Sequence, residues 1–139
     1  MSGGSRALLD TGVLVAFLHR ADADHPSAVR AIEEFQGSLV TTEAVLTEGV
    51  YLLRGVSGGA RRCLDFFIRG GAVLVPSSKA SLLRSQQIMD RYADLPADFA
   101  DATLVALAEE MDAWTVFTLD RRGFSVYRGS DGQSFEILP

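Results

Sequence analysis

Residues 7–18 read ALLDTGVLVAFL, and this stretch decides the fold. Its first three residues, Ala7 to Leu9, predict a short buried strand that ends at Asp10. A helix is expected from Thr11 to Arg20, because apolar residues recur there at helical spacing: Val13, Leu14, Phe17 and Leu18. A buried strand that passes directly into a helix is typical of a parallel sheet with helical connections.

The same alternation continues along the chain. Further helices are expected at 25–35, 43–54, 60–69, 78–92 and 98–111, and further strands at 39–41, 72–75, 114–119 and 135–138. Short apolar strands that alternate with helices predict an α/β fold whose five-stranded sheet is mainly parallel and flanked by helices.

Composition limits the class of protein. A chain of 139 residues that is 47% hydrophobic fits one domain with its own core, preceded by a flexible Gly/Ser-rich leader at residues 1–6. The single cysteine, Cys63, excludes an intrachain disulfide and suits a reducing cytoplasm, and no apolar run is long enough to cross a membrane. The net charge of −5 argues against a nucleic-acid binder, unless acids that hold divalent cations reverse the local charge.

Acids follow two of the expected strands. Asp10 ends the first strand and Asp120 ends the strand at 114–119, so both are expected at the carboxyl edge of the sheet, where open parallel sheets bind ligands. Asp101 lies in the first turn of the helix that leads to the second of these strands, near the same edge. Like charges gathered there repel one another unless a cation binds between them.

Each acid also has an ordinary structural interpretation. Asp98 is a plausible helix N-cap, with Asp101 three residues later as a first-turn acid that the helix dipole favours. Asp10 could cap the helix that follows it, and Asp120 could open a turn. The helix at 43–54 adds Glu43 and Glu48, which flank its apolar stripe on opposite sides. Spacing does not choose between these two, although Glu48 is mid-helix and therefore more informative.

Four segments, taken together and in this order, resemble the motifs of PIN-domain ribonucleases. They are LLDTGVL at 8–14, TTEAVLTE at 41–48, DFADATLVALA at 98–108 and FTLDRRGF at 117–124. In its length and in the sequences of these four motifs, the chain is most similar to the VapC toxins of toxin–antitoxin pairs. The resemblance implies a three-layer PIN-like domain, a homodimer, a small antitoxin partner, and cleavage of RNA with Mg²⁺ or Mn²⁺.

The resemblance also aligns particular acids with the family's site. Its motifs place Asp10, Glu48, Asp101 and Asp120 in the catalytic and metal-binding set, with Asp98 as an accessory. Carboxylates without nearby histidine or cysteine suit Mg²⁺ or Mn²⁺ rather than zinc. Four further side chains could bind substrate: Thr11 and Thr118 through their hydroxyls, and Arg121 and Arg122 along the RNA backbone or simply in a solvated turn.

Other functions fit the sequence less well. Residues 8–12 also resemble the aspartic protease motif, but those enzymes are all-β and this chain is mostly helical. A phosphoaspartyl phosphatase would have a second acid at position 12, where Gly12 stands. Two alternatives remain: a PIN-like RNA-processing nuclease without an antitoxin, and a non-catalytic PIN-like binding module.

Overall fold

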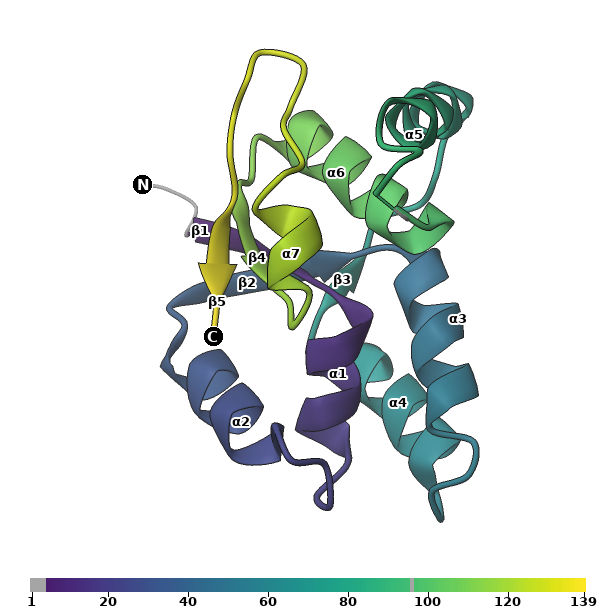
Figure 1. The fold of residues 1–139 in the computed structure, drawn as a ribbon. Coiled ribbons are helices and arrows are strands. Elements are labelled where there is room, and N and C mark those ends of the chain that lie inside the picture. The colour runs from purple at the N-terminus through teal and green to yellow at the C-terminus, as the bar shows by residue number, and fades with distance from the viewer. Residues whose placement is uncertain (1–4, 96) are drawn as a thin grey trace.

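The computed structural model describes residues 5–95 and 97–139 (Figure 1). Five strands form one sheet: β1 (Ser5–Leu9), β2 (Gly37–Thr41), β3 (Val73–Leu74), β4 (Thr115–Phe117) and β5 (Glu136–Leu138). The helices are α1 (Thr11–Leu18), α2 (His25–Glu34), α3 (Glu43–Leu52), α4 (Gly59–Ile68), α5 (Lys79–Arg91), α6 (Phe99–Met111) and α7 (Arg121–Phe124).

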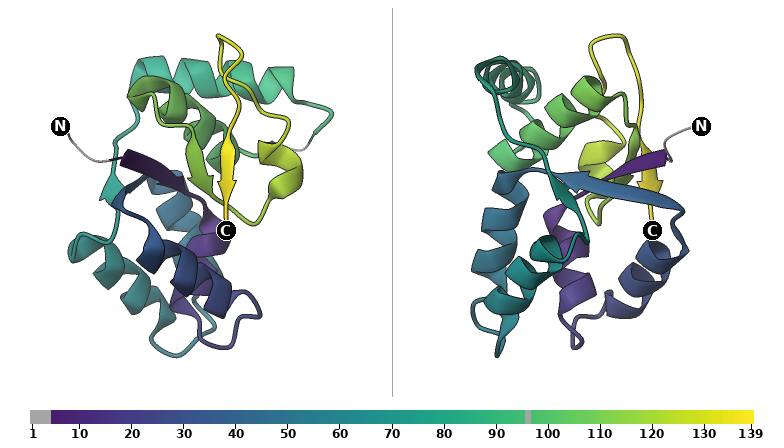
Figure 2. Two further views of the ribbon diagram at one scale, coloured as in Figure 1. Left: turned by 90° about the vertical axis from the view of Figure 1, so that its left-hand side faces the viewer. Right: turned by 180° about the vertical axis from the view of Figure 1, so that it is seen from behind.

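The sheet has the strand order β3-β2-β1-β4-β5, and every neighbouring pair is parallel. This confirms the expected α/β fold. Parallel strands need crossover connections, and the helices supply them on both faces of the sheet. Helices α1 to α4 cover one face, whereas α5 and α6 cover the other (Figures 1 and 2).

The core lies between these layers. Leu8 and Leu9 of β1 and Val116 and Phe117 of β4 are fully buried, as the continuous apolar runs of central parallel strands require. Helix α6 is buried along most of its length, from Ala100 to Ala108. A helix that is apolar on nearly all sides belongs inside the protein, which explains why α5 packs over it.

The strand order reverses at the centre of the sheet. From β1 the chain builds outward through β2 to β3, and it then returns to add β4 and β5 on the opposite side of β1. The carboxyl ends of β1 and β4 are therefore adjacent at the switch point, where this class of sheet binds ligands. The backbone N–H of Asp10 donates to the carbonyl of Phe117 at 2.9 Å and fixes these two ends together.

Several boundaries differ from the sequence-based expectation. Ser5 and Arg6, expected in the leader, belong to β1 and pair with Gly37 and Ser38, while residues 1–4 lie outside the described part of the chain. Strand β4 ends at Phe117, so Thr118 and Leu119 separate it from Asp120. The short helix α7 was not expected, because four residues carry no helical periodicity. In the described residues, no helix has the length and apolar character needed to span a membrane.

Candidate active site

Asp10 lies at the switch point between β1 and β4 and is only 7% exposed. Its Oδ1 accepts a 2.8 Å hydrogen bond from the backbone N–H of Thr11, and its Oδ2 accepts one of 2.6 Å from the Thr118 hydroxyl. Burial raises the pKa of Asp10 from 3.8 to about 6; these hydrogen bonds oppose the rise, and the charges of Asp120 and Asp98 add to it. A buried acid with a raised pKa is a feature of functional sites.

Asp101 projects from the first turn of α6, and its pKa is raised even further. Burial is the largest cause, followed by the charges of Asp10, Asp98 and Asp120, and together they raise the pKa of Asp101 from 3.8 to about 7. Asp98 is the N-cap of α6: its Oδ1 accepts a 2.9 Å hydrogen bond from the backbone N–H of Asp101. The capping role expected for Asp98 is therefore present, and it does not prevent the same residue from adding to the local charge.

Asp120 also caps a helix. Its Oδ1 accepts a 3.0 Å hydrogen bond from the backbone N–H of Gly123 at the start of α7. Its own backbone N–H donates to the Thr118 hydroxyl oxygen at 3.0 Å. Thr118 thus connects the two aspartates that follow β1 and β4, because its hydroxyl donates to one and accepts from the backbone of the other.

Glu48 reaches the site from α3. Its Oε1 accepts a 2.8 Å hydrogen bond from the Thr11 hydroxyl, and Thr11 is the residue next to Asp10. Glu43, the alternative on the same helix, is exposed. The structure therefore brings Glu48 to the beginning of α1, beside Asp10, and leaves Glu43 in solvent.

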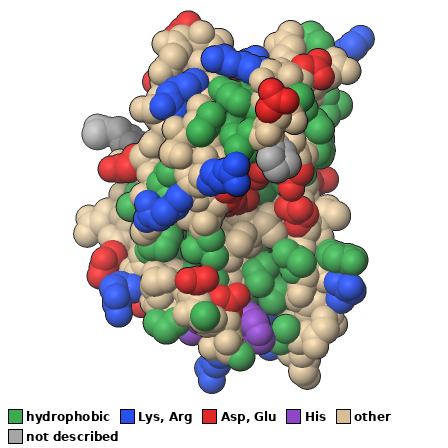
Figure 3. All heavy atoms as spheres, viewed as in Figure 1, with side chains coloured by type: hydrophobic (Ala, Val, Ile, Leu, Met, Phe, Trp, Pro, Cys, Tyr) green, Lys and Arg blue, Asp and Glu red, His purple; other side chains and the backbone are tan. Residues whose placement is uncertain are grey.

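The four aspartates, Asp10, Asp98, Asp101 and Asp120, lie in one region of the protein, but their side chains are not arranged as a complete set of metal ligands. The charges of Asp98 and Asp120 act to raise the pKa values of both Asp10 and Asp101, so the four carboxylates are near enough to repel one another. Within the described ranges, however, no group of three or more His, Cys, Asp or Glu side chains is already arranged to hold an ion. The donor set fits a hard divalent cation chemically, since it offers carboxylate oxygens whose mutual repulsion a cation would relieve. Figure 3 shows acidic side chains gathered around the hollow in the middle of this face.

The four expected substrate contacts differ in outcome. The hydroxyls of Thr11 and Thr118 are buried and donate to Glu48 and Asp10, so they position carboxylates instead of facing water or phosphate. Arg121 and Arg122 are exposed on α7, and the Arg121 guanidinium donates to the carbonyl of Pro139. Arg122 is the better placed of the two to contact a substrate, because no hydrogen bond within the described residues uses its guanidinium.

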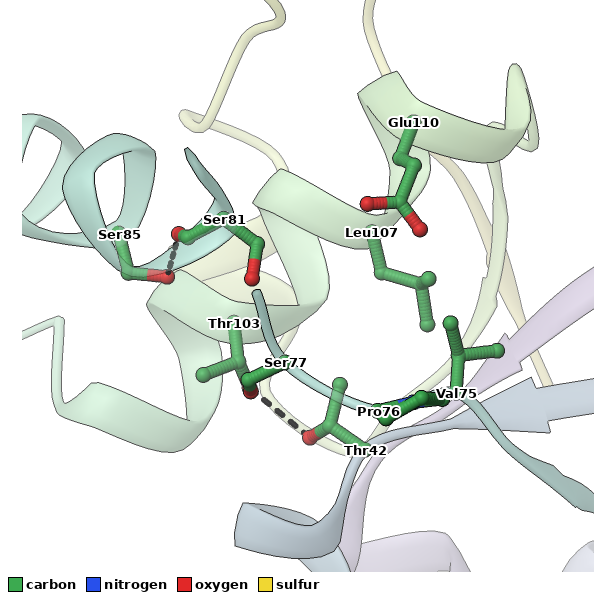
Figure 4. A pocket seen from close by; sticks show the side chains of 9 residues that line it. All are labelled: Thr42, Val75, Pro76, Ser77, Ser81, Ser85, Thr103, Leu107 and Glu110. Atoms are coloured by element: carbon green, nitrogen blue, oxygen red, sulfur yellow. Dashed lines mark hydrogen bonds between the residues drawn. The ribbon is translucent and has the colours of Figure 1, made fainter. Parts of the chain in front are cut away.

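Hydroxyl groups also fix the helices that carry the acids. The Thr42 and Thr103 hydroxyls are 2.9 Å apart and join the start of α3 to α6 (Figure 4). Ser85 donates to the carbonyl of Ser81 at 2.9 Å on the facing turn of α5. The cavity among these groups holds about 10 Å³, room for a single water. It therefore serves the packing of α3 against α6 and has no room for a substrate.

Two further residues of the site, Tyr127 and Gly123, were not predicted from the sequence. Tyr127 is 1% exposed, and its hydroxyl donates to Oδ2 of Asp101 at 3.3 Å. Its ring packs edge-on against Tyr92 and Phe124, which fixes its direction. A Cβ at Gly123 would collide with Oδ2 of Asp120 and approach the Tyr127 hydroxyl to 2.9 Å. A tyrosine in a short loop and a glycine in a turn carry no distinctive spacing, so only the tertiary structure reveals them.

Comparisons with known proteins agree with this architecture. The family model for the PIN domain matches residues 7–129, so the chain belongs to the PIN-domain family. Among characterised relatives, Ribonuclease VapC26 of Mycobacterium tuberculosis is 31% identical over 134 residues, which cover 95% of this chain and 99% of the relative.

Solved structures share the fold at lower identity. VapC20 of Mycobacterium tuberculosis, described as a Sarcin-Ricin loop cleaving toxin, superposes with a TM-score of 0.77 at 20% identity, covering 86% of this chain and 94% of that one. VapBC2 of Rickettsia felis, bound to a promoter DNA fragment, gives a TM-score of 0.71 at 14% identity, with 96% and 99% covered. A toxin–antitoxin complex from Klebsiella pneumoniae gives 0.70 at 16%, with 96% of each chain covered.

Proposed function

We propose that this chain is an endoribonuclease that cleaves RNA phosphodiester bonds with Mg²⁺ or Mn²⁺. The observation that carries the proposal is the position of Asp10 and Asp101: two carboxyls with raised pKa values meet at the switch point of a PIN-domain sheet. Similarity to a ribonuclease over nearly the whole chain supports the same activity.

Each acid receives a role from its surroundings. We assign Asp10 and Asp101 to direct contact with the cation, Glu48 and Asp120 to contact with it directly or through water, and Asp98 to support of Asp101. When bound, a divalent cation supplies a water of lowered pKa and neutralises charge on the phosphodiester. Thr118 and Thr11 hold Asp10 and Glu48 in fixed orientations, as outer-shell partners of metal ligands do. Arg122 offers an exposed guanidinium to the RNA backbone.

The proposed biological role is that of the cytoplasmic toxin in a toxin–antitoxin pair. Two of the similar structures are described as a toxin and as a toxin–antitoxin complex. Helices α3 and α4 also expose large apolar side chains that a partner could cover: Tyr51, Leu52, Leu64 and Ile68. We propose that this surface and its surroundings serve a homodimer and an amphipathic antitoxin segment with a basic residue directed toward the acids. A monomeric mass at micromolar concentration would contradict the dimer, and a co-encoded small protein that fails to inhibit would contradict the antitoxin.

The decisive experiment is a cleavage assay on structured RNA with metal controls. Cleavage is expected with Mg²⁺ or Mn²⁺, and EDTA should abolish it. Asp10→Asn should be inactive, whereas Asp24→Asn should keep wild-type activity, because Asp24 is an exposed N-cap of α2 whose side chain makes no capping bond. Cleavage that persists in EDTA, or that only zinc supports, would refute the proposal.

The non-catalytic binding module makes the opposite prediction in the same assay. Such a module would bind RNA or protein as well after the Asp10→Asn substitution as before it, and neither form would cleave RNA. Asp10 and Asp101 favour the nuclease, because a binding module has no use for two neighbouring carboxyls that burial and charge repulsion hold at raised pKa values. A nuclease without an antitoxin would cleave RNA in the assay and lack an inhibitory neighbour.

A further inference from the structure

An open cavity lies beside the acids, between α3 and the first turn of α6. It encloses about 390 Å³ and is lined by six residues: Ala44, Thr47, Glu48, Asp98, Phe99 and Ala100. Its floor is largely apolar, in contrast to the charged site next to it. Glu48 and Asp98 belong both to this cavity and to the candidate active site, so a substrate bound at the acids has direct access to the cavity.

Phe99 is the unusual member of this lining. It follows the N-cap Asp98 and precedes Asp101 by two positions, and 44% of it is exposed. Its aromatic ring is therefore accessible at the edge of the charged site, where a ligand in the cavity can contact it. The ring belongs to a helix that is buried from Ala100 to Ala108 except at Asp101, so a rigid element holds it in place.

We propose that this cavity binds an unpaired nucleobase of the RNA substrate, stacked on the ring of Phe99. Sequence-specific recognition of RNA relies on splayed-out bases that stack on aromatic side chains, and every base offers a π-face for such stacking. The proposal rests on the ribonuclease function proposed above and identifies a residue that selects its substrate.

The polar rim of the cavity suits a base and excludes a phosphate. Oδ1 of Asp98 is used by the backbone N–H of Asp101, while its Oδ2 has no hydrogen-bond partner in the described part of the chain. The Thr47 hydroxyl adds a second polar group at the rim. A carboxylate only accepts hydrogen bonds, so the rim favours a base edge with N–H donors and repels an anionic group. The phosphodiester would then lie toward the cation site, and the base would lie on Phe99.

Stacking on Phe99 can be measured directly. RNA oligonucleotides with 2-aminopurine at successive positions are mixed with Asp10→Asn protein, which binds without cleaving. At one position, binding should quench the fluorescence. The quenching should disappear in Asp10→Asn/Phe99→Ala and return in Asp10→Asn/Phe99→Trp, because tryptophan restores an aromatic face.

Kinetics with the otherwise wild-type protein give a second measurement. Phe99→Ala should raise KM about tenfold or more while kcat changes less than about threefold, since base stacking contributes to binding. Leu82→Ala is the matched control, because Leu82 is a similarly exposed apolar residue in α5, on the far side of α6. Melting curves of each variant verify that the fold is intact.

The outcomes separate this inference from the proposed function. If wild type neither binds nor cleaves RNA, the ribonuclease proposal fails and the base site fails with it. If RNA is cleaved but Phe99→Ala keeps both the wild-type KM and the quenching, the base site alone is refuted. The base site is also refuted if Leu82→Ala reproduces the effect, or if Phe99→Ala loses only the binding of a co-encoded protein.

Discussion

The Thr118 hydroxyl donates a 2.6 Å hydrogen bond to Oδ2 of Asp10 and so joins two residues 108 positions apart in the sequence. The bond crosses the switch point from the end of β4 to the end of β1. Both groups are buried, so the contact lies in a low-dielectric environment where it orients the carboxyl strongly. Thr118 is therefore a positioning residue for the central acid of the site.

Replacing Thr118 with valine tests that role. Thr118→Val keeps the shape of the side chain and removes the donor, so Asp10 loses orientation and the pKa of Asp10 rises further, because this hydrogen bond lowers it. We expect cleavage to fall about 10- to 100-fold, the usual effect of losing an outer-shell partner. The control is Thr115→Val in β4, three residues earlier, whose hydroxyl donates to Glu136 away from the acids. Equal losses in both variants would show that Thr118 matters only for folding.

The raised pKa values predict how stability depends on pH without metal. Asp10 and Asp101 bind protons more tightly in the folded protein than in the unfolded chain. Their stabilising contribution is therefore complete below pH 3.8 and declines as the pH rises through about 6 and 7. Burial acts to raise the pKa of Glu109, but hydrogen bonds from Arg84 and Ser130 outweigh it and lower that pKa, so the contribution of Glu109 stays constant between pH 5 and 8.

Urea unfolding in EDTA should therefore show a less stable protein at pH 8 than at pH 5. The rise in the pKa of Asp10 from 3.8 to about 6 corresponds to a decline of order 3 kcal/mol over the whole range from below pH 3.8 to pH 8, and roughly half of this decline falls between pH 5 and pH 8. Asp10→Asn should remove part of this decline and gain about 0.5–2 kcal/mol at pH 8, while Asp24→Asn should not. If Asp10→Asn is markedly less stable than wild type at pH 8, Asp10 is mainly a structural cap.

The same carboxyls predict how metal binding depends on pH. Cations bind the ionised form, so protons compete with Mn²⁺ at Asp10 and Asp101 below about pH 7. Calorimetric titration should show an affinity for Mn²⁺ that weakens steadily from pH 8 to pH 5.5, with protons released on binding. An affinity that is constant over this range would indicate a site elsewhere.

The fold could be predicted from the sequence because each strand and helix has its own apolar pattern, and the two patterns alternate along the chain. Buried strands such as Ala7–Leu9 carry continuous apolar runs, and the helices between them carry a clear period. Asp10, Asp101 and Asp120 could be placed together because the ends of parallel strands share one edge. The burial of a side chain cannot be derived from these patterns. The sequence therefore predicts that the hydroxyls of Thr11 and Thr118 face the substrate, whereas in the structure they are buried against carboxylates.

Tyr127 and Phe99 show why the rest needed the structure. Tyr127 contacts Asp101 because its ring packs against Tyr92, at the end of α5, and against Phe124 of α7. The contact with Tyr92 joins segments that are distant in the chain. Phe99 appears as one more apolar residue of a periodic helix, and only the neighbouring α3 turns its exposed ring into the wall of a cavity.

A substitution at Gly123, in α7, tests whether Asp120 and Tyr127 must keep their present positions. Gly123→Ala would place a Cβ against Oδ2 of Asp120 and the Tyr127 hydroxyl, so both groups must move. We expect at least a tenfold loss of cleavage and a stability loss of about 1–3 kcal/mol, the range for overpacking. Gly55→Ala is the control, because nothing lies within 4 Å of the added methyl group. A fully active Gly123→Ala protein would show that Asp120 is not needed in its present position.

Tyr127→Phe tests whether the hydrogen bond from the Tyr127 hydroxyl to Asp101 orients this carboxylate for metal binding. The change keeps the ring packing and removes the hydroxyl that donates to Asp101, so the pKa of Asp101 should rise further and the carboxyl should lose its fixed direction. We expect about tenfold weaker Mn²⁺ binding and a pH–activity profile displaced to higher pH. Tyr92→Phe separates this effect from stability: the Tyr92 hydroxyl accepts from the backbone N–H of Arg128 and does not reach an acid. It should lower the melting temperature while leaving the pH profile in place. If the two variants behave alike, Tyr127 contributes only to packing, and Asp101 owes its orientation to α6 alone.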